Sequence, residues 1–466
     1  MIKTETIAAI ATSLSDSGIS IIRISGEDAV AISDRVFQSK SGKKISEFKS
    51  HTIHYGHIIH QNEIVDEVMV SFMKSPNSYT TEDTVEINCH GGVFITKKVL
   101  HLILQNGARL AMPGEFTKRA FLNGRIDLSK AEAIMDIIHA DNEFALQIGI
   151  KQLKGSVSNK VKDLRDKLIF EIAFIESALD DPEHISLDGY SNSLKEKLLE
   201  ILKELHKIEE TAENGKIMKQ GIRTVIVGKP NAGKSSFLNL LVGEEKAIVT
   251  DIAGTTRDAL EEYIKIGEIG FHVIDTAGIR KTKDEVEKIG VSKAVKFASD
   301  ADLILYVVDS SVPLDENDME IIDMTVGKKM IILFNKSDLD TVLDEKEVEN
   351  LLIQKNHQKE DFRFIKISAK EKEGLDVFEK TVKDMFFHGE ISIQDEVMIT
   401  NIRQQEAIMD TIASLQFVLK SIEDNMPEDF LTIDLMSAYE SLGKIIGEEI
   451  GEDLVNEIFS KFCMGK

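Results

Sequence analysis

The chain is poor in cysteine and in long apolar runs. Only Cys89 and Cys463 occur in 466 residues, which excludes a disulfide framework and predicts a reducing compartment, and neither cysteine lies at a metal-ligand spacing. No apolar run approaches the roughly 18 residues that a membrane-spanning helix requires. Because residues 1–5 also lack the apolar core of a signal peptide, we expect a cytoplasmic protein without membrane association.

Positive charge is also in deficit. The chain has 56 Lys and Arg against 80 Asp and Glu, a formal net charge of −24. Non-specific binding to nucleic acid depends on cationic side chains that neutralise phosphates, so the charge balance argues against it. An RNA contact would therefore need a local basic patch or a partner protein. Hydrophobic residues make up 42% and charged residues 29%, as in globular proteins, and the length predicts about three domains.

One glycine-containing stretch, GKPNAGKSS at 228–236, lies between the apolar runs 224–227 and 237–241. This order predicts a strand, a loop and a helix, and the spacing fits the phosphate-binding loop. In such a loop, backbone N–H groups turn toward the phosphates and the helix presents its positive end to them. We predict that Lys234 reaches the β- and γ-phosphates and that Ser235 binds Mg²⁺. A glycine-rich turn without a ligand is the alternative for an isolated match.

Two signals for the γ-phosphate follow in the sequence. The segment GTTRD at 254–258 offers Thr256 as a second hydroxyl ligand of Mg²⁺. The apolar segment 272–275 ends in Asp275, which can hold Mg²⁺ through water, and Gly278 can donate its N–H to the γ-phosphate. Both signals stand at the ends of predicted strands.

Two further signals concern the base. The segment NKSD at 335–338 ends in Asp338, whose carboxylate can accept both the N1–H and the exocyclic amine of guanine, and SAK at 368–370 can present backbone to the guanine oxygen. Adenine lacks that pair of donors, so the predicted base is guanine. Five motifs in this order, each at a strand end, predict a Mg²⁺-dependent GTPase.

The residue that would orient the attacking water is missing. Small signalling GTPases use a Gln after the Asp-x-x-Gly turn, where this chain has Ile279. An apolar side chain cannot orient water. Asn231 can help to bind a monovalent cation beside the β- and γ-phosphates, together with carbonyls and hydroxyls of 250–255, in place of an arginine finger. A turn-forming Asn after Pro230 is an equal alternative.

The N-terminal region has the pattern of an α+β domain. Alternating, β-branched segments predict strands at 6–11, 19–24, 52–59, 65–72 and 84–89, interleaved with helices near 27–37 and 92–105. Arg23, Glu86 and His90 lie on or beside these strands. Taken alone, the two charged residues are expected to be solvated, and His90 is expected to be a satisfied hydrogen-bonding residue.

Helical patterns flank an alternating α/β region. After Asp127, Ser129 and Glu132 form a capping-box pattern, and apolar residues from Ile150 to Leu179 recur at spacings of three and four as one long stripe. We expect that stripe to pack against helices of the same chain rather than to form a coiled coil. Further helices are predicted at 193–214, 401–423, 433–446 and 453–462, and alternating strands and helices at 221–387.

The predicted fold class is an α/β P-loop GTPase domain inserted into an α-helical domain and preceded by an N-terminal α+β domain. The expected boundaries are 1–118 for the α+β domain, 119–220 and 388–466 for the two helical halves, and 221–387 for the GTPase domain. Insertion is tolerated where the ends of the inserted segment are close together.

Five segments together closely resemble the tRNA-modification GTPase family MnmE, also called TrmE. They are GKPNAGKSS (228–236), TDIAGTTRD (250–258), DTAGIR (275–280), PGEFTKRAFLNGRIDL (113–128) and the terminal FCMGK (462–466). The resemblance covers the whole chain. It implies a homodimer that forms a heterotetramer with MnmG (GidA), a flavin- and NADH-using partner, to build aminomethyl or carboxymethylaminomethyl groups at carbon 5 of the tRNA wobble uridine.

The same resemblance implies the cofactors and their residues. GTP, Mg²⁺, K⁺ and a tetrahydrofolate are implied, the folate being 5,10-methylenetetrahydrofolate with 5-formyltetrahydrofolate as an analogue, bound in the N-terminal domain. The implied folate contacts are Arg23, Glu86, Arg125 and Lys466. The implied potassium ligands are Asn231, Thr250, Ile252 and Thr255, with Ser235 and Thr256 on Mg²⁺. The family often has Lys in place of Arg125, which alters hydrogen-bond geometry.

The implied nucleotide-binding positions follow the five motifs. They are Asn231, Ala232, Gly233, Lys234, Ser235, Ser236, Thr250, Asp251, Ile252, Ala253, Gly254, Thr255, Thr256, Asp275, Thr276, Ala277, Gly278, Asn335, Lys336, Asp338, Ser368, Ala369 and Lys370. The implied catalytic residues are Glu287, which orients water indirectly, the switch residue Arg280, and Cys463, either a thiol near the modification site or a structural one.

Two features leave alternatives open. Where the family usually has a Pro-rich loop containing Arg and Gly, this chain has SLSDSG at 13–18, which bears on folate and dimer contacts. The second function weighed is a GTPase switch for ribosome assembly. That function predicts a dedicated basic RNA module, which we do not find in this sequence.

Overall fold

The computed structural model describes residues 5–140, 142–243, 261–266, 269–275, 301–386, 397–448, 451–462 and 465. The chain divides into two compact units. Unit 1 comprises Met1–Ile138, Ile150–Lys195 and Ala413–Lys466, and unit 2 comprises His139–Gly149 and Glu196–Ile412. The division passes through three helices, α5 (Glu143–Leu153), α7 (Tyr190–Gln220) and α13 (Ile402–Glu423).

A seven-stranded sheet forms the N-terminal part of unit 1. Its order is β3 (Phe37–Ser39), β4 (Thr52–His60), β5 (Glu63–Met73), β6 (Thr84–Gly91), β2 (Ser17–Ser25), β1 (Ile7–Ile10) and β7 (Arg109–Leu110). Neighbours are antiparallel except β1 and β7, which are parallel. The five predicted strands are confirmed. The short strands β3 and β7 were missed, because two or three residues are too few to show alternation.

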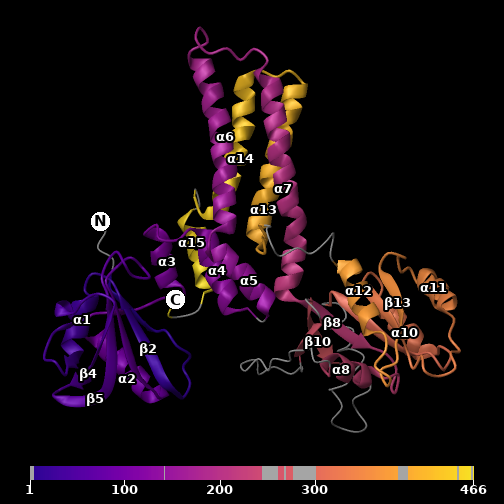
Figure 1. Cartoon of the computed structure of the whole chain (residues 1–466), viewed down its shortest axis with the longest axis horizontal. Helices are drawn as coiled ribbons and strands as arrows, with labels where there is room; N and C mark the ends of the chain where they lie inside the picture. The colour runs from indigo at the N-terminus through magenta and orange to yellow at the C-terminus, as the bar shows by residue number, and fades with distance from the viewer. Residues whose placement is uncertain are drawn as a thin grey trace. The chain divides into compact units, whose positions relative to one another are not determined.

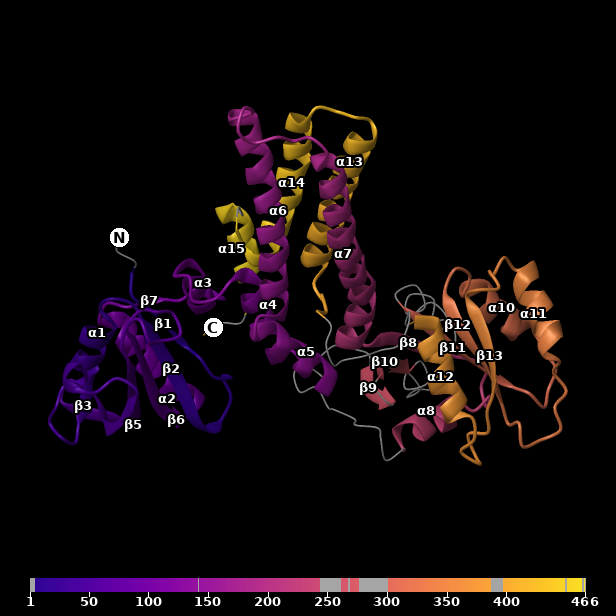
Figure 2. The ribbon, with the colours of Figure 1, turned by 45° about the horizontal axis from the view of Figure 1, so that its top comes forward.

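Two helices cover one face of this sheet, α1 (Ala29–Val36) and α2 (Val93–Gln105) (Figure 2). Alternate residues of the central strands point into the shared core, so Ile22 and Ile24 of β2 meet Val85 and Ile87 of β6 beneath Val99 of α2. The α+β pattern predicted for this region is confirmed.

Helices from both halves of the sequence pack together in unit 1. They are α3 (Glu115–Leu122), α4 (Leu128–Ile138), α6 (Ser156–Asp180), α14 (Glu428–Ile446) and α15 (Glu452–Ser460). Helices α6 and α14 lie side by side (Figure 1), and Leu128 and Ala131 of α4 share a core with Val455 and Phe459 of α15. The C-terminal helices therefore complete the helical layer begun after Asp127, as predicted.

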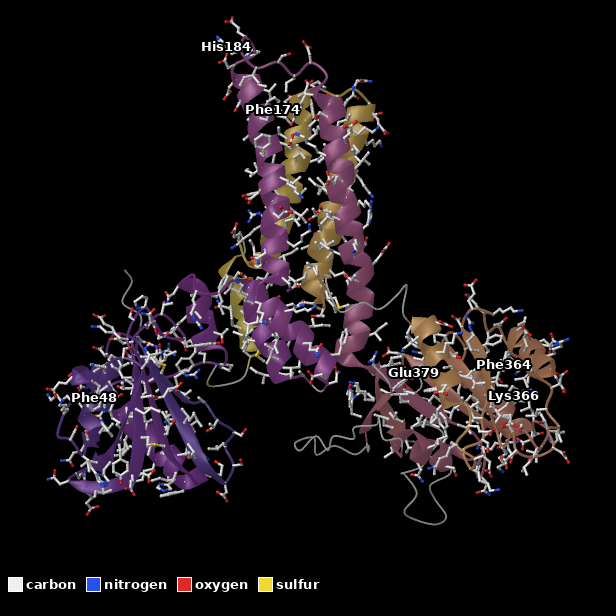
Figure 3. All side chains as sticks on the ribbon, in the orientation of Figure 1. Phe48, Phe174, His184, Phe364, Lys366 and Glu379 are labelled. Atoms are coloured by element: carbon white, nitrogen blue, oxygen red, sulfur yellow. The ribbon has the colours of Figure 1, made fainter. Side chains whose placement is uncertain are left out.

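The single apolar stripe predicted from Ile150 to Leu179 is wrong, because the helix breaks within it. Helix α5 ends at Leu153, and Gly155 adopts the left-handed conformation with φ 98° before α6 begins. A left-handed glycine ends a helix without steric penalty. Spacing alone missed the break, since the apolar positions resume in α6. Near the C-terminal end of α6, the ring of Phe174 (labelled in Figure 3) packs against the ring of Tyr190, with 4.7 Å between the ring centroids.

The predicted cap at Ser129 is also wrong, since helix α4 already begins at Leu128. Asp127 accepts from the Lys130 N–H at 3.0 Å and from the Ser129 hydroxyl at 2.6 Å. Its second carboxylate oxygen accepts from the Ser158 hydroxyl of α6 at 2.7 Å. Although burial raises the pKa of Asp127, the bonds from Ser129, Ser158 and the Lys130 amide lower it overall. A carboxylate accepts these donors better than a serine hydroxyl.

A second sheet, with six strands, lies in unit 2. Its order is β13 (Phe362–Lys366), β12 (Lys329–Asn335), β11 (Leu303–Asp309), β8 (Ile222–Val227), β10 (Ile269–Asp275) and β9 (Glu261–Ile266). All neighbours are parallel except β9 and β10.

Helices cover both faces of this second sheet. Helices α8 (Lys234–Val242) and α12 (Leu375–Phe386) pack on one face, and α10 (Glu316–Met324) and α11 (Glu345–Gln354) on the other. The doubly wound architecture predicted for this region is confirmed. None of the helices in the described ranges is both long and apolar enough to span a membrane.

Candidate functional site

The phosphate loop joins β8 to α8 in a conformation that requires glycine. Gly228, Asn231 and Gly233 have φ angles of 148°, 63° and 100°. A Cβ on Gly228 would lie 2.3 Å from the Val307 carbonyl oxygen, and one on Gly233 would lie 2.0 Å from Nδ2 of Asn335. Both glycines therefore combine a left-handed backbone with close contact to the neighbouring strands.

Lys234, the first residue of α8, is held across the phosphate loop. Its Nζ donates to the carbonyl oxygens of Gly228 and Lys229, both at 2.7 Å. An ammonium group is thereby fixed at the positive end of a helix. Together they form an electropositive cradle for phosphate oxygens.

Asn335 connects the phosphate loop to the base-recognition segments. Its side chain is buried, with the residue 2% exposed. Nδ2 donates to the Ala232 carbonyl oxygen at 2.8 Å, and Oδ1 accepts from the Ala369 N–H at 3.2 Å. Three motifs thus meet at one side chain, at the carboxyl ends of β8, β12 and β13, although Asn335 is 103 positions from Ala232 and 34 positions from Ala369.

Asp338 lies beside Ser368, as the guanine prediction requires of these two motifs. The Ser368 hydroxyl donates to Oδ1 of Asp338 at 2.7 Å. That bond lowers the pKa of Asp338, which keeps the carboxylate ionised and able to accept. Lys336 has φ 63° and pairs with Asp309 at the end of β11. An acceptor and a fixed cation therefore flank the expected position of the base.

Ser235 and Ser236 lie in the first turn of α8 and are exposed, as is Lys370. Ten further nucleotide positions lie outside the described residues. These are Thr250, Asp251, Ile252, Ala253, Gly254, Thr255, Thr256, Thr276, Ala277 and Gly278, together with the proposed catalytic residues Arg280, Glu287 and Cys463 and the terminal Lys466. The backbone of Asp275 ends β10, paired in register with Ile226 of β8. The roles of Asp275 and of the residues outside the described ranges stay predictions.

Arg23 and Glu86 form an ion pair on adjacent strands of unit 1. Nε of Arg23 lies 2.8 Å from Oε1 of Glu86, and their side chains are only 18% and 21% exposed. Nη1 of Arg23 also donates to the Gly465 carbonyl oxygen at 3.2 Å. The expectation that these two charges are solvated is wrong, because β2 and β6 place them in register as a largely buried pair and Gly465 contacts Arg23.

Tyr79 joins this pair to Arg125. The guanidinium carbons of Arg23 and Arg125 lie 5.3 Å and 5.0 Å from the centre of the Tyr79 ring, and Nη1 of Arg125 donates to the Tyr79 carbonyl oxygen at 2.9 Å. Arg125 also lines a pocket of about 680 Å³. The pocket lining is His51, Met73, Pro76, Asn77, Ser78, Tyr79, Thr81, Asn123, Gly124 and Arg125. Sequence reasoning missed Tyr79, whose signal is a single aromatic residue in a polar segment.

His90 is a satisfied hydrogen-bonding residue, as predicted. Its Nδ1 lies 2.6 Å from Oδ1 of Asp66, and its backbone N–H donates to Oδ2 of the same carboxylate at 2.9 Å. The bond to Asp66 raises the pKa of His90. Cys89, the residue before His90 on β6, is a buried free thiol.

The strand, phosphate loop and helix, joined by Asn335 to the segments NKSD and SAK, define a P-loop GTPase. Two family models cover most of the chain: "GTP-binding protein TrmE N-terminus" matches residues 6–125 and "MnmE helical domain" matches residues 128–463. The chain belongs to the MnmE family of tRNA modification GTPases.

Two curated relatives support this membership, and one solved structure is given with them for its sequence similarity alone. The chain is 57% identical over 465 residues to the tRNA modification GTPase MnmE of Lachnoclostridium phytofermentans, covering 100% of both chains. It is 47% identical over 464 residues to that of Thermoanaerobacter pseudethanolicus, covering 99% of both. Among solved structures, a variant of Aquifex aeolicus Era bound to GDP and AlF4⁻ is 28% identical, with 41% of this chain and 66% of that chain covered and a TM-score of 0.27.

Proposed function

We propose that this protein is a potassium-dependent GTPase of tRNA modification. With MnmG (GidA) it adds aminomethyl or carboxymethylaminomethyl groups at carbon 5 of the wobble uridine, and tetrahydrofolate supplies the one-carbon unit. The observation that carries the folate part of this proposal is that Arg23, paired with Glu86, and Arg125 both lie against the Tyr79 ring. The family match favours tRNA modification over ribosome assembly as the cellular role.

The residues around Tyr79 fit a tetrahydrofolate. Folates carry a pterin ring with several N–H donors and a glutamate with carboxylates. Arg125, which lines the pocket with Tyr79, can bind a carboxylate, and Glu86, paired with Arg23, is the proposed acceptor for the pterin. When bound, 5,10-methylenetetrahydrofolate would supply a carbon for transfer. Lys466, one residue beyond Gly465, is a further proposed contact.

A binding measurement tests the folate site. Isothermal titration of the full-length protein with 5-formyltetrahydrofolate should show loss of binding in Arg125→Met, because the cation beside the pocket is removed. Arg109→Met is the matched control, since Arg109 pairs with Glu115 in the same unit and does not line the pocket. Equal affinity in Arg125→Met and the wild type would refute the folate assignment and leave the GTPase assignment untouched.

Asn231 fits the role of a potassium ligand. It is exposed on the left-handed crest of the phosphate loop, and its side-chain amide has no hydrogen bond to any residue in the described ranges. An amide oxygen there is available to a cation. Bound K⁺ would supply positive charge beside the β- and γ-phosphates, where charge develops during hydrolysis. Thr250, Ile252 and Thr255 are the other proposed K⁺ ligands, and Ser235 and Thr256 the proposed Mg²⁺ ligands.

The potassium proposal predicts an ion-specific rate. GTP turnover should be faster in KCl than in NaCl at equal ionic strength, and Asn231→Ala should remove most of the difference. Asn239→Ala, an exposed change on α8, should retain it. Equal turnover of the wild type in both salts would refute potassium dependence.

The cellular role is tested by complementation. A bacterial strain without its own family member should recover the modified wobble uridine, measured by nucleoside mass spectrometry, when this chain is expressed. Failure by the wild-type chain, with soluble protein present, would contradict the tRNA assignment. The proposed assembly is a cytoplasmic homodimer that binds MnmG as a heterotetramer, with Glu287, Arg280 and Cys463 as proposed catalytic residues. Domain boundaries at 118, 220 and 387 belong to the same proposal.

A further inference from the structure

Lys229, the second residue of the phosphate loop, forms an ion cluster with Asp315 and Asp318. Nζ of Lys229 lies 2.7 Å from Oδ2 of Asp318 and 3.0 Å from Oδ2 of Asp315. The Lys229 side chain is 13% exposed and that of Asp318 only 1%. The Lys229–Asp318 pair is therefore shielded from water, where an ion pair holds its geometry more firmly than on the surface, whereas the Asp315 side chain is 51% exposed.

Both carboxylates are fixed by further bonds. Asp318 accepts from the buried Tyr306 hydroxyl at 2.7 Å and from the Asp315 N–H at 2.8 Å. Asp315 caps helix α10, since its Oδ1 accepts from the Asn317 N–H at 3.0 Å. The position of the Lys229 ammonium is thus set by strand β11 and by the first turn of α10.

The backbone of the same residue supports the catalytic lysine. The Lys229 carbonyl oxygen accepts from Nζ of Lys234 at 2.7 Å, and it also accepts from the Ala232 N–H at 3.3 Å. Lys229 therefore contacts the two carboxylates through its side chain, and Ala232 and Lys234 of the phosphate loop through its carbonyl oxygen. Asn231, the proposed cation ligand, lies between Lys229 and Ala232 in the turn that their hydrogen bond closes.

We propose that Lys229 is a positioning residue for GTP hydrolysis. Its ion cluster with Asp315 and Asp318 fixes the Lys229 carbonyl, and through it Lys234, relative to the γ-phosphate. Charge grows on the transferred phosphate in the transition state, so a displaced Lys234 weakens transition-state binding more than ground-state binding. This proposal rests on GTPase activity alone and does not depend on potassium or folate.

Steady-state kinetics of the full-length protein test the proposal. Lys229→Met should lower kcat for GTP about tenfold while KM changes less than about threefold, as expected for a small misplacement of a catalytic group. Lys229→Arg should recover most of the rate, because a guanidinium can bridge both carboxylates. A kcat within twofold of the wild type in Lys229→Met would overturn the proposal.

A matched control separates positioning from stability. Lys355→Met removes another lysine that pairs with α10, where Nζ lies 2.8 Å from Asp323, and it should leave kcat unchanged. An equal loss in this control would overturn the proposal.

A milder variant decides the question if Lys229→Met does not fold. Asp315→Asn keeps an oxygen to cap α10 but removes one negative charge. It should lower kcat about threefold, a smaller misplacement of the same kind. Unchanged kcat in Asp315→Asn would refute the positioning role.

Discussion

The phosphate loop of unit 2 differs in construction from a side-chain cluster of unit 1. That cluster, here called the Arg23 cluster, consists of Arg23, Glu86, Tyr79 and Arg125. The loop is one contiguous segment whose conformation is set by backbone, with glycines at φ 148° and 100°. The cluster is made of side chains, and Arg23 contacts Gly465 across 442 positions of sequence. A local motif can be recognised from its spacing alone, whereas a cluster of this kind exists only after the chain has folded.

The difference predicts where single substitutions act. A side-chain change at Lys234 should impair nucleotide chemistry with a small effect on stability, since that residue is only partly buried. A change in the Arg23 cluster should mainly affect the stability of unit 1, because it leaves a partly buried charge without its partner.

Lys234→Ala tests the chemical side of the comparison and should have the largest effect. Removing the ammonium that spans Gly228 and Lys229 should lower kcat/KM for GTP by about 100-fold or more. Steady-state phosphate release measures this, with exposed Lys346→Ala on α11 as the control. A loss below tenfold would mean that the cradle depends on backbone groups alone.

Asp338→Asn sharpens the comparison at the base-binding end. An amide presents a donor toward the guanine N1–H, so the ratio of kcat/KM for GTP to that for xanthosine triphosphate should fall about 100-fold. Competition between the two nucleotides measures this ratio. The neighbouring exposed Asp340→Asn should leave it unchanged, and an unchanged ratio in Asp338→Asn would reject guanine readout by this carboxylate.

Arg23→Met tests the structural side. It leaves Glu86 unpaired at 21% side-chain exposure, so the free energy of unfolding of unit 1 should fall by about 1 to 2 kcal/mol, less than for a fully buried pair. Urea denaturation followed by fluorescence or circular dichroism measures the change, while basal kcat for GTP should stay within twofold. A large loss of kcat with unchanged stability would show that the Arg23 cluster acts on GTP turnover rather than on the stability of unit 1.

The smallest effect concerns pH and Asp127, whose pKa is lowered in the folded state. A lowered folded pKa means that the carboxylate stabilises the fold fully above the ordinary Asp value of about 3.9, and that this stabilisation is lost as pH falls through the lower folded value. Asp127→Asn should reduce the loss of stability below about pH 4 and cost about 1 kcal/mol at pH 7. Thermal unfolding from pH 2.5 to 7 measures this, with exposed Asp180→Asn as the control. A dependence of stability on pH equal to that of the wild type would show that Asp127 does not contribute to the loss of stability in acid.

Local patterns gave a large part of the fold and only half of the candidate sites. The five long strands of the first sheet, the alternating order of the second and the phosphate loop were predictable, because alternation, apolar spacing and glycine position act over a few residues. The break at Gly155 and the cap at Asp127 were not, since the same apolar spacing and the same polar residues are compatible with more than one helix boundary.

Contiguous motifs such as GKPNAGKSS at 228–236 and NKSD at 335–338 were enough to assign the nucleotide class and the family. Only the tertiary structure decided that Tyr79 stands between Arg23 and Arg125, that Gly465 closes on Arg23, and that Lys229 is anchored to α10. These contacts join residues dozens to hundreds of positions apart. Their geometry follows from strand register and helix packing, which a linear pattern of residue types does not contain.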